Sequence, residues 1–214
     1  MNVERLAFPA PLLCIDDFLS DEGANSVFEE CIGLKSVFMP AMVGDGGGSL
    51  KCDPTLRKNE VMYLSEIFRT APERSRILMT MKKGMSTGEA SKVWKRDGLI
   101  FDILNYANNR EAVVSRFGNC DFFAQHRDVV MGQNSPRRLV TLVYYVNAVP
   151  ERFTGGSIVF RDGGESVKVQ PRHNRAVVFL SSTLHEVEGV QLESDAWEHG
   201  RFSINLWAGF REAR

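Results

Sequence analysis

The second half of the chain constrains the fold more than any other part of it. From Glu111 onward, short runs rich in valine, isoleucine, phenylalanine and tyrosine alternate with turn sequences. Two of these turns are Gly155-Gly156 and Asp162-Gly163-Gly164, and the second predicts a β-hairpin. Short strands at this spacing are typical of a sandwich or barrel of the jelly-roll type. The predicted strands are Ala112–Phe117, Arg138–Asn147, Ser157–Arg161, Ser166–Gln170, Arg175–Ser181 and Arg201–Gly209.

The first 110 residues carry helix signals instead. Ser20 is a typical N-cap for a helix that continues through Cys31. Thr70 begins a capping-box sequence for a second helix, for which Gly84 is the expected stop, and the apolar spacing over residues 99–107 predicts a third. We therefore expect an α+β chain that is mainly β with helical support. Because no linker rich in proline or serine separates the halves, residues 1–214 are expected to form a single domain, with 1–110 as a mostly helical lead-in and lid and 111–214 as the β core.

Charge and hydropathy count against several function classes. The chain has 26 lysines and arginines against 27 aspartates and glutamates, so its net charge is −1. Proteins that bind nucleic acid usually show a basic excess or a basic stripe, so no nucleic-acid partner is expected. No apolar stretch approaches the about 20 residues of a membrane span, and Pro9 and Pro11 break the N-terminal apolar run that a secretory signal would need. We expect a cytoplasmic protein whose four widely separated cysteines are reduced.

Three residues in the β core have the composition of a metal site. His126 and Asp128 are two positions apart, and on an extended chain such residues face the same side, with Arg127 turned away. His185 follows the apolar run that ends at Leu180. Two histidines and one carboxylate on a β scaffold are the ligands of the facial triad that holds non-haem Fe(II) and leaves positions open. Taken alone, the same residues could be a surface His–Asp pair and a core histidine bonded to the backbone.

A second group of residues indicates an anion site. Arg201 and Ser203 share one face of a strand with alternating apolar residues, and a buried guanidinium is costly unless an anion meets it. The anion could be an internal carboxylate or the carboxylate of a ligand, which a planar guanidinium binds through two parallel hydrogen bonds. By alternation, either Tyr144 or Tyr145 must point inward, where its hydroxyl needs a partner.

The order of these motifs resembles the prolyl-4-hydroxylase-like branch of the Fe(II)/2-oxoglutarate-dependent dioxygenases. The resemblance covers about residues 112–210 and implies a double-stranded β-helix (jelly roll) with N-terminal helices. There are two departures: Phe117 stands where the family often has tyrosine, and Gln191–Gly200 lengthens the interval between His185 and Arg201. The matching segments are Phe117-Gly118, Asp121-Phe122-Phe123-x-x-His126-x-Asp128, Leu142–Asn147, Gly155–Phe160, Arg175–Phe179, His185-Glu186-Val187 and Arg201-x-Ser203.

The resemblance also implies an activity and a set of cofactors. By this resemblance the chain is an oxygenase that hydroxylates an unactivated C–H bond of an amino acid, a peptidyl residue such as proline, or a small metabolite, while 2-oxoglutarate is decarboxylated to succinate. His126, Asp128 and His185 resemble the ligands of Fe(II). The cosubstrates would be 2-oxoglutarate and O2, with ascorbate as a candidate reductant.

The cosubstrate contacts follow from the same resemblance. Arg201 resembles the basic residue that binds the distal carboxylate of 2-oxoglutarate. Tyr145 resembles a tyrosine that bonds to that carboxylate, and Ser203 is a further candidate for this cluster.

Two other function classes remain open at this point. A cupin-like metalloenzyme of another class, such as a hydrolase or isomerase using Zn²⁺ or Mn²⁺, would bind metal without depending on 2-oxoglutarate. A metal-free β-sandwich binding module would change little beyond local stability when His126 or His185 is replaced. Neither the substrate, the carbon hydroxylated nor the oligomeric state follows from the sequence.

Three segments could contribute to substrate selection. The glycine-rich loop Gly44–Ser49 could be a lid over the site, since mobile lids are often loops of this kind. The inserted loop Gln191–Gly200 could contact substrate. Arg57 and Lys58 could supply a cation that faces substrate, although exposure on the surface is the default expectation.

Overall fold

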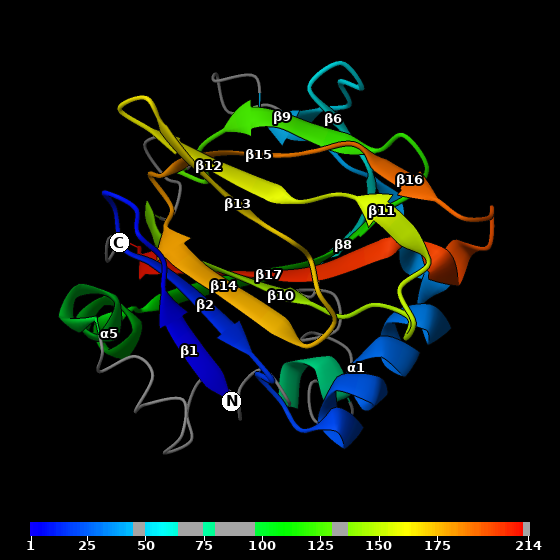
Figure 1. The fold of residues 1–214 in the computed structure, drawn as a ribbon, viewed down its shortest axis with the longest axis horizontal. Helices are drawn as coiled ribbons and strands as arrows, with labels where there is room; N and C mark the ends of the chain where they lie inside the picture. Colours follow the sequence, from blue (N-terminus) through cyan, green and yellow to red (C-terminus); the bar gives the residue numbers. More distant parts are fainter. Residues whose placement is uncertain (45–49, 64–74, 80–96, 130–136, 212–214) are drawn as a thin grey trace.

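The computed structural model describes residues 1–44, 50–63, 75–79, 97–129 and 137–211. Its core is a pair of antiparallel β-sheets that face each other, and the helices lie outside the larger sheet (Figure 1). This arrangement confirms the predicted jelly roll with helical support.

The larger sheet has eight strands in the order β1-β2-β14-β10-β17-β8-β7-β3. Neighbouring strands are antiparallel throughout. The central strands β10 and β17 are long because they are rich in β-branched and aromatic residues and have no proline or glycine over most of their length. The strands are β1 (Asn2–Arg5), β2 (Leu12–Asp16), β3 (Met39–Pro40), β7 (Glu60–Tyr63), β8 (Asn109–Phe117), β10 (Arg137–Tyr145), β14 (Arg175–Leu180) and β17 (Arg201–Phe210).

The smaller sheet has five strands in the order β13-β12-β15-β9-β6. The predicted hairpin is present, since β12 and β13 pair across Gly163 and Gly164, whose φ angles of 55° and 91° favour glycine. The strands are β6 (Arg57–Lys58), β9 (Phe122–His126), β12 (Ile158–Asp162), β13 (Glu165–Val169) and β15 (Leu184–Val187). Two further pairs join β4 (Val43–Gly44) to β5 (Leu50–Lys51) and β11 (Phe153–Gly155) to β16 (Val190–Leu192).

Alternation along β10 divides the core into two layers. Tyr144 belongs to the apolar layer between the larger sheet and the helices, where its ring packs against Phe18. Tyr145 belongs to the layer between the two sheets, together with Phe160 and Phe179. The inward tyrosine of the predicted pair is therefore Tyr145.

Two of the three predicted helices are confirmed. The first is α1 (Asp21–Gly33), and the Ser20 hydroxyl accepts a hydrogen bond from the Gly23 N–H at its N-terminus. The third is α5 (Gly98–Tyr106), whose first turn is capped by Asp97. The capping box at Thr70 and the expected stop at Gly84 lie outside the described residues, although residues 76–79 are helical. Within the described ranges, no helix combines the length and the apolarity needed to cross a membrane.

The prediction of a mostly helical lead-in is wrong for much of the described part of residues 1–110. Seven short strands lie there, and β2 and β7 pair directly with strands of the β core. Strand β2 was missed because Leu12–Ile15 is buried on both faces and forms a continuous apolar run without alternation. The lead-in therefore completes both sheets as well as covering one of them.

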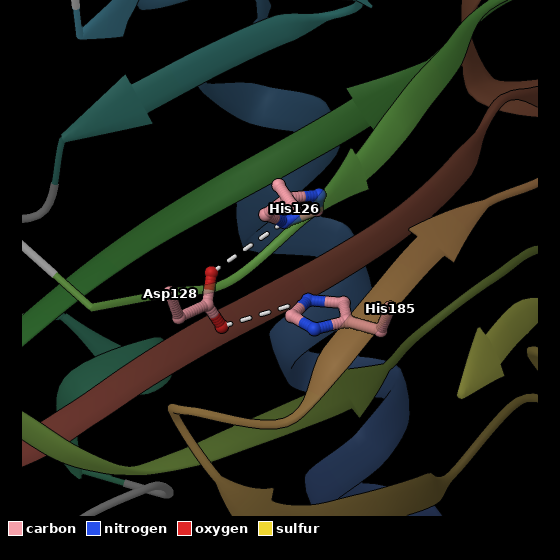
Figure 2. Close-up of side chains that lie close together, drawn as sticks. All are labelled: His126, Asp128 and His185. Carbon is pink, nitrogen blue, oxygen red and sulfur yellow. Dashed lines mark ion pairs between the residues drawn. The ribbon is translucent and has the colours of Figure 1, made fainter. Parts of the chain in front are cut away.

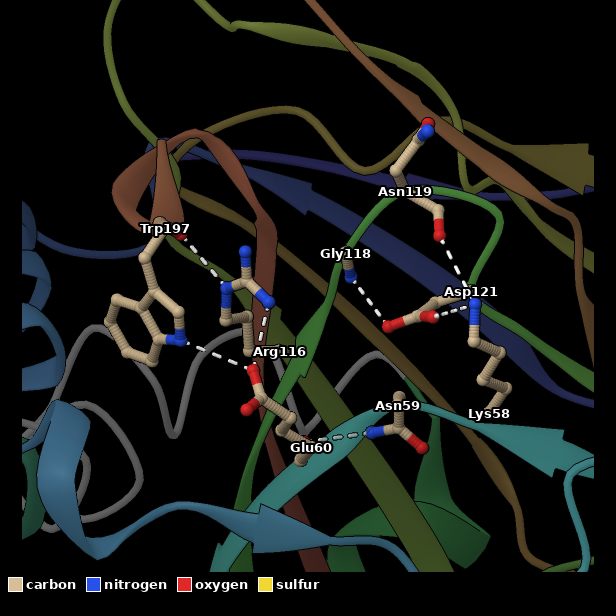
Figure 3. Close-up of polar contacts among 8 residues, drawn as sticks. All are labelled: Lys58, Asn59, Glu60, Arg116, Gly118, Asn119, Asp121 and Trp197. Atoms are coloured by element: carbon tan, nitrogen blue, oxygen red, sulfur yellow. Dashed lines mark hydrogen bonds and ion pairs between the residues drawn. The ribbon is translucent and has the colours of Figure 1, made fainter. Parts of the chain in front are cut away.

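The segment Gln191–Gly200 is fastened to the larger sheet rather than extended into solvent. It contains the end of β16 and the short 3-10 helix η3 (Trp197–His199). The Trp197 indole N–H and the Arg116 guanidinium both donate to Glu60 Oε2, at 3.1 and 2.8 Å, and Arg116 Nε donates to the Trp197 carbonyl oxygen (Figure 3). These contacts fix the start of β17, where Arg201 lies.

Candidate active site

His126, Asp128 and His185 converge between the ends of two neighbouring strands. His126 on β9 and His185 on β15 are directly paired in the sheet register, and their ring centroids are 4.2 Å apart. Asp128 lies just beyond β9, and its carboxylate oxygens are 3.6 Å from His126 Nε2 and 3.8 Å from His185 Nε2 (Figure 2). One ligand atom from each residue falls within 4.8 Å of the others. The predicted spacing of His126 and Asp128 therefore brings both side chains to one place.

Backbone carbonyl groups set the orientation of both imidazoles. His126 Nδ1 is 2.8 Å from the Ala124 carbonyl oxygen, and His185 Nδ1 is 2.9 Å from the Thr183 carbonyl oxygen. A carbonyl oxygen only accepts, so each Nδ1 carries the proton and each Nε2 presents its lone pair toward Asp128. Metal-binding histidines are commonly oriented in this way.

Burial and mutual interaction set the charges of these groups. Burial lowers the pKa of His185 to about 4, so its imidazole is neutral at pH 7. Burial acts to raise the pKa of Asp128, but interactions with His185 and His126 outweigh it and hold that pKa well below its usual range. Two histidines and one ionised carboxylate are the donor set of a facial triad, so the three residues fit Fe(II).

Two hydroxyl groups support the carboxylate. The Thr141 hydroxyl on β10 donates to Asp128 Oδ2 at 2.9 Å, and its oxygen lies 2.9 Å from the hydroxyl oxygen of Ser181. The Asp128 N–H donates to the Ser181 carbonyl oxygen. The sequence analysis missed Thr141, although it lies on the same face of β10 as Tyr145, four residues away.

Arg201 is a buried cation in the same interior. Its side chain is 1% exposed, and its Nε donates to the Gly156 carbonyl oxygen at 2.7 Å. Its Nη1 lies 3.4 Å from Ser203 Oγ, so the two residues share a face as predicted. Its guanidinium lies over the rings of Phe117 and Tyr145, at 4.7 and 4.8 Å from the centroids. Among the described residues, no carboxylate lies within 4 Å of Arg201, so the internal salt bridge is absent from this part of the chain.

Tyr145 completes the anion site. It is fully buried, and its hydroxyl has no hydrogen-bond partner within the described part of the protein. Burial raises its pKa, so the hydroxyl keeps its proton and can donate to an anion. A buried guanidinium and a buried hydroxyl, both available to a ligand, fit a carboxylate such as that of 2-oxoglutarate. Phe117, at the position where the family often has tyrosine, contributes a ring and no hydroxyl.

Aromatic side chains pack between the candidate metal ligands and the Arg201–Tyr145 pair. Phe179 and Phe160 share the inter-sheet layer with Tyr145, and their ring centroids are 4.9 and 5.9 Å from that of His185. The residues predicted for metal and cosubstrate therefore face one continuous interior.

A family comparison identifies this part of the chain. Residues 112–209 match the model of the 2OG-Fe(II) oxygenase superfamily. The β core is therefore similar to this superfamily, and the matched residues include both predicted groups.

Solved structures share the fold of this chain over nearly its whole length. A Pseudomonas putida prolyl-4-hydroxylase is 18% identical, with a TM-score of 0.68 over 95% of this chain and 94% of that chain. A prolyl hydroxylase in complex with a hypoxia inducible factor peptide fragment, from Trichoplax adhaerens, is 20% identical, with a TM-score of 0.64 over 92% and 83%. The viral collagen prolyl hydroxylase of Paramecium Bursaria Chlorella virus-1, solved with 2OG, is 16% identical, with a TM-score of 0.58 over 92% of this chain and 94% of that chain. The chain therefore has the double-stranded β-helix fold of prolyl hydroxylases.

One sequence relative is a hydroxylase by name. An uncharacterized PKHD-type hydroxylase from Synechocystis sp. is 20% identical over 95% of this chain. The chain spans 65% of the length of that relative.

Proposed function

We propose that the protein is a hydroxylase that uses Fe(II), 2-oxoglutarate and O2 to hydroxylate an unactivated C–H bond. His126, Asp128 and His185 would hold Fe(II), and Arg201, Tyr145 and Ser203 would bind the distal carboxylate of 2-oxoglutarate. When bound, Fe(II) supplies the redox chemistry that couples decarboxylation of 2-oxoglutarate to succinate with oxygen insertion into the substrate. The likeness to prolyl hydroxylases makes peptidyl proline one candidate substrate, beside free amino acids and small metabolites.

The chain's own residues perform the binding and orienting steps. Backbone carbonyl groups keep the two Nε2 lone pairs directed at the metal position, and Thr141 fixes the carboxylate of Asp128. Arg201 would neutralise the far end of the cosubstrate in a site from which apolar rings exclude water. The observation that carries the proposal is the buried Arg201, which has no acidic partner among the described residues and faces the same interior as the histidines.

Anaerobic titration of 2-oxoglutarate into the Fe(II)-loaded protein tests the proposal. Chelation by the metal gives a weak visible charge-transfer band, and we expect this band in the wild type. Arg201→Ala should weaken 2-oxoglutarate binding tenfold or more, because the loss of one partner of a buried charge pair costs about 2–5 kcal/mol.

The control is Arg152→Ala, which removes a half-exposed arginine paired with Glu193 and should leave the titration unchanged. Metal binding without a band would favour a cupin-like metalloenzyme of another class. A protein that binds no metal would instead be the metal-free binding module.

A further inference from the structure

Arg57 lies next to the candidate metal site, on the edge strand of the smaller sheet. It pairs in register with Phe123 of β9, and its guanidinium carbon is 4.5 Å from the centre of the Phe123 ring. The His126 ring stacks on Phe123 at 3.5 Å and 14°. Because the His126 imidazole covers one face of the Phe123 ring, the Arg57 guanidinium must lie on the opposite face of that ring. The three side chains form a stack that ends at a proposed metal ligand.

The charge of Arg57 is uncompensated within the described residues. Its Nε donates to Asn59 Oδ1 at 2.7 Å, and this partner is a neutral amide. No carboxylate of the described ranges lies within 4 Å of it. Lys58, the next residue on β6, is by contrast half-exposed and pairs with Asp121 at 3.3 Å (Figure 3). The expectation of a surface position is thus confirmed for Lys58 and wrong for Arg57.

Arg57 remains a cation at the pH of the cell. Burial lowers its pKa to about 10, and Tyr63 and the carboxylate of Asp128 oppose that effect. Arg57 is partly buried, and a partly buried cation without an anion is costly to keep in a fold. Its guanidinium has five N–H groups, of which Asn59 accepts one, so the paired terminal N–H groups can bind a carboxylate.

The charge balance of the loaded site indicates what this cation would meet. The two positive charges of Fe(II) and the charge of Arg201 are matched by Asp128 and the two carboxylates of 2-oxoglutarate. The nearby Arg138 is already paired with Glu111 at 2.6 Å. Among the described residues near the metal site, Arg57 and Arg127 then have no acidic partner. Arg127 is exposed and donates to the Ser182 carbonyl oxygen, whereas Arg57 is partly buried, and a carboxylate group of the substrate would match its charge.

We propose that Arg57 binds a carboxylate of the primary substrate, which makes that substrate a small carboxylic acid such as a free amino acid. This inference rests on the proposed function. An interior residue of a peptide has neutral amides on both sides, so its own backbone would offer Arg57 no counter-charge.

Binding of matched probe pairs to the full-length protein loaded with Zn(II) and 2-oxoglutarate tests the inference. The probes are the L-amino acids, each as the acid and as its carboxamide, and binding is measured by saturation-transfer NMR. We expect at least one acid to bind tenfold or more tightly than its carboxamide. Arg57→Gln should abolish that preference, Arg57→Lys should keep part of it, and the control Lys58→Gln should leave it unchanged.

The outcomes separate this inference from the proposed function. If 2-oxoglutarate does not bind to the Zn(II)-loaded protein, both are wrong. If 2-oxoglutarate binds but no acid is preferred over its carboxamide, the hydroxylase proposal stands and the role of Arg57 is refuted. If Arg57→Gln weakens binding of the acid and of its carboxamide equally, or if the variant loses the metal, Arg57 only stabilises the packing of Phe123 and His126.

Discussion

Gly156 positions the Arg201 side chain in two ways, through a hydrogen bond to its carbonyl oxygen and through the space left by its lack of a side chain. The carbonyl accepts from Arg201 Nε, and the backbone adopts a φ of 66°, which favours glycine. A Cβ at this position would lie 2.7 Å from Arg201 Cδ and 2.9 Å from Val190 Cγ2. The turn signal in the sequence is thus also a condition for placing the buried cation.

Gly156→Ala should therefore weaken 2-oxoglutarate binding about tenfold, because it displaces a charged hydrogen bond worth about 1.5–3 kcal/mol. Overpacking and backbone strain should also cost about 1–3 kcal/mol of unfolding free energy. Isothermal titration calorimetry and urea denaturation measure the two effects. The matched control is Gly163→Ala, since Gly163 has a φ of 55° but nothing within 4 Å of its Cβ position. Equal losses of 2-oxoglutarate affinity in both variants would contradict a steric effect on Arg201.

At the scale of elements, one ion pair joins the N-terminal strand β2 to the core strand β14. Arg175 donates to both carboxylate oxygens of Asp16, at 2.6 and 2.8 Å. The hydrogen bond from Arg175 lowers the pKa of Asp16 against the opposing effect of burial. The pair stabilises the fold while Asp16 is ionised, above the unfolded-state pKa of about 4, and this contribution is lost as pH falls through the lowered folded pKa.

Asp16→Asn should cost about 1–2 kcal/mol of unfolding free energy at pH 7. This figure allows for the 38% exposure of the Asp16 side chain and for the buried Arg175, which would lose its acidic partner and keep only its hydrogen bond to the Gln170 carbonyl oxygen. The difference in unfolding free energy between this variant and the wild type should be smaller at pH 3 than at pH 7. Urea denaturation at the two pH values measures this difference. Glu193→Gln, in a half-exposed pair, should stay within about 0.5 kcal/mol at both. A difference that is constant with pH would mean that the mutation acts through packing instead of charge.

The elements predictable from sequence are those whose signal is local. Runs rich in β-branched and aromatic residues located β10 and β17, and alternation along β17 placed Arg201 and Ser203 on one face. Alternation left Tyr144 and Tyr145 as alternatives, of which the family resemblance indicated Tyr145. The two-residue spacing of His126 and Asp128 was likewise sufficient to place them together. Strands of two to four residues, such as β6 and β15, carry too little periodicity to be detected. The role of Arg57 depends on the pairing of β6 with β9, more than 60 positions away in the chain, which no local pattern contains.

At the scale of the whole molecule, both sheets extend beyond the region that matches the family model. Residues 112–209 contain the candidate site, but β2 covers one side of β14 and β7 pairs with β8. The residues of β2 contribute to both apolar layers, and α1 and α5 cover the outer face of the larger sheet. Without these elements, two strand edges and one apolar face of the core would be exposed to water.

A fragment of residues 112–214 should consequently fail to fold, although it carries every residue proposed to bind metal and 2-oxoglutarate. We expect dispersed amide resonances and a cooperative thermal transition for the full chain, and neither for the fragment. Adding the separate polypeptide 1–111 should restore both, since β-pairing and helix packing supply the missing burial without a covalent link. A fragment that unfolds cooperatively near the full-length Tm would show instead that the lead-in serves selectivity and not stability. The expected result would establish residues 1–214 as one domain, because the strands that complete each sheet come from both halves of the chain.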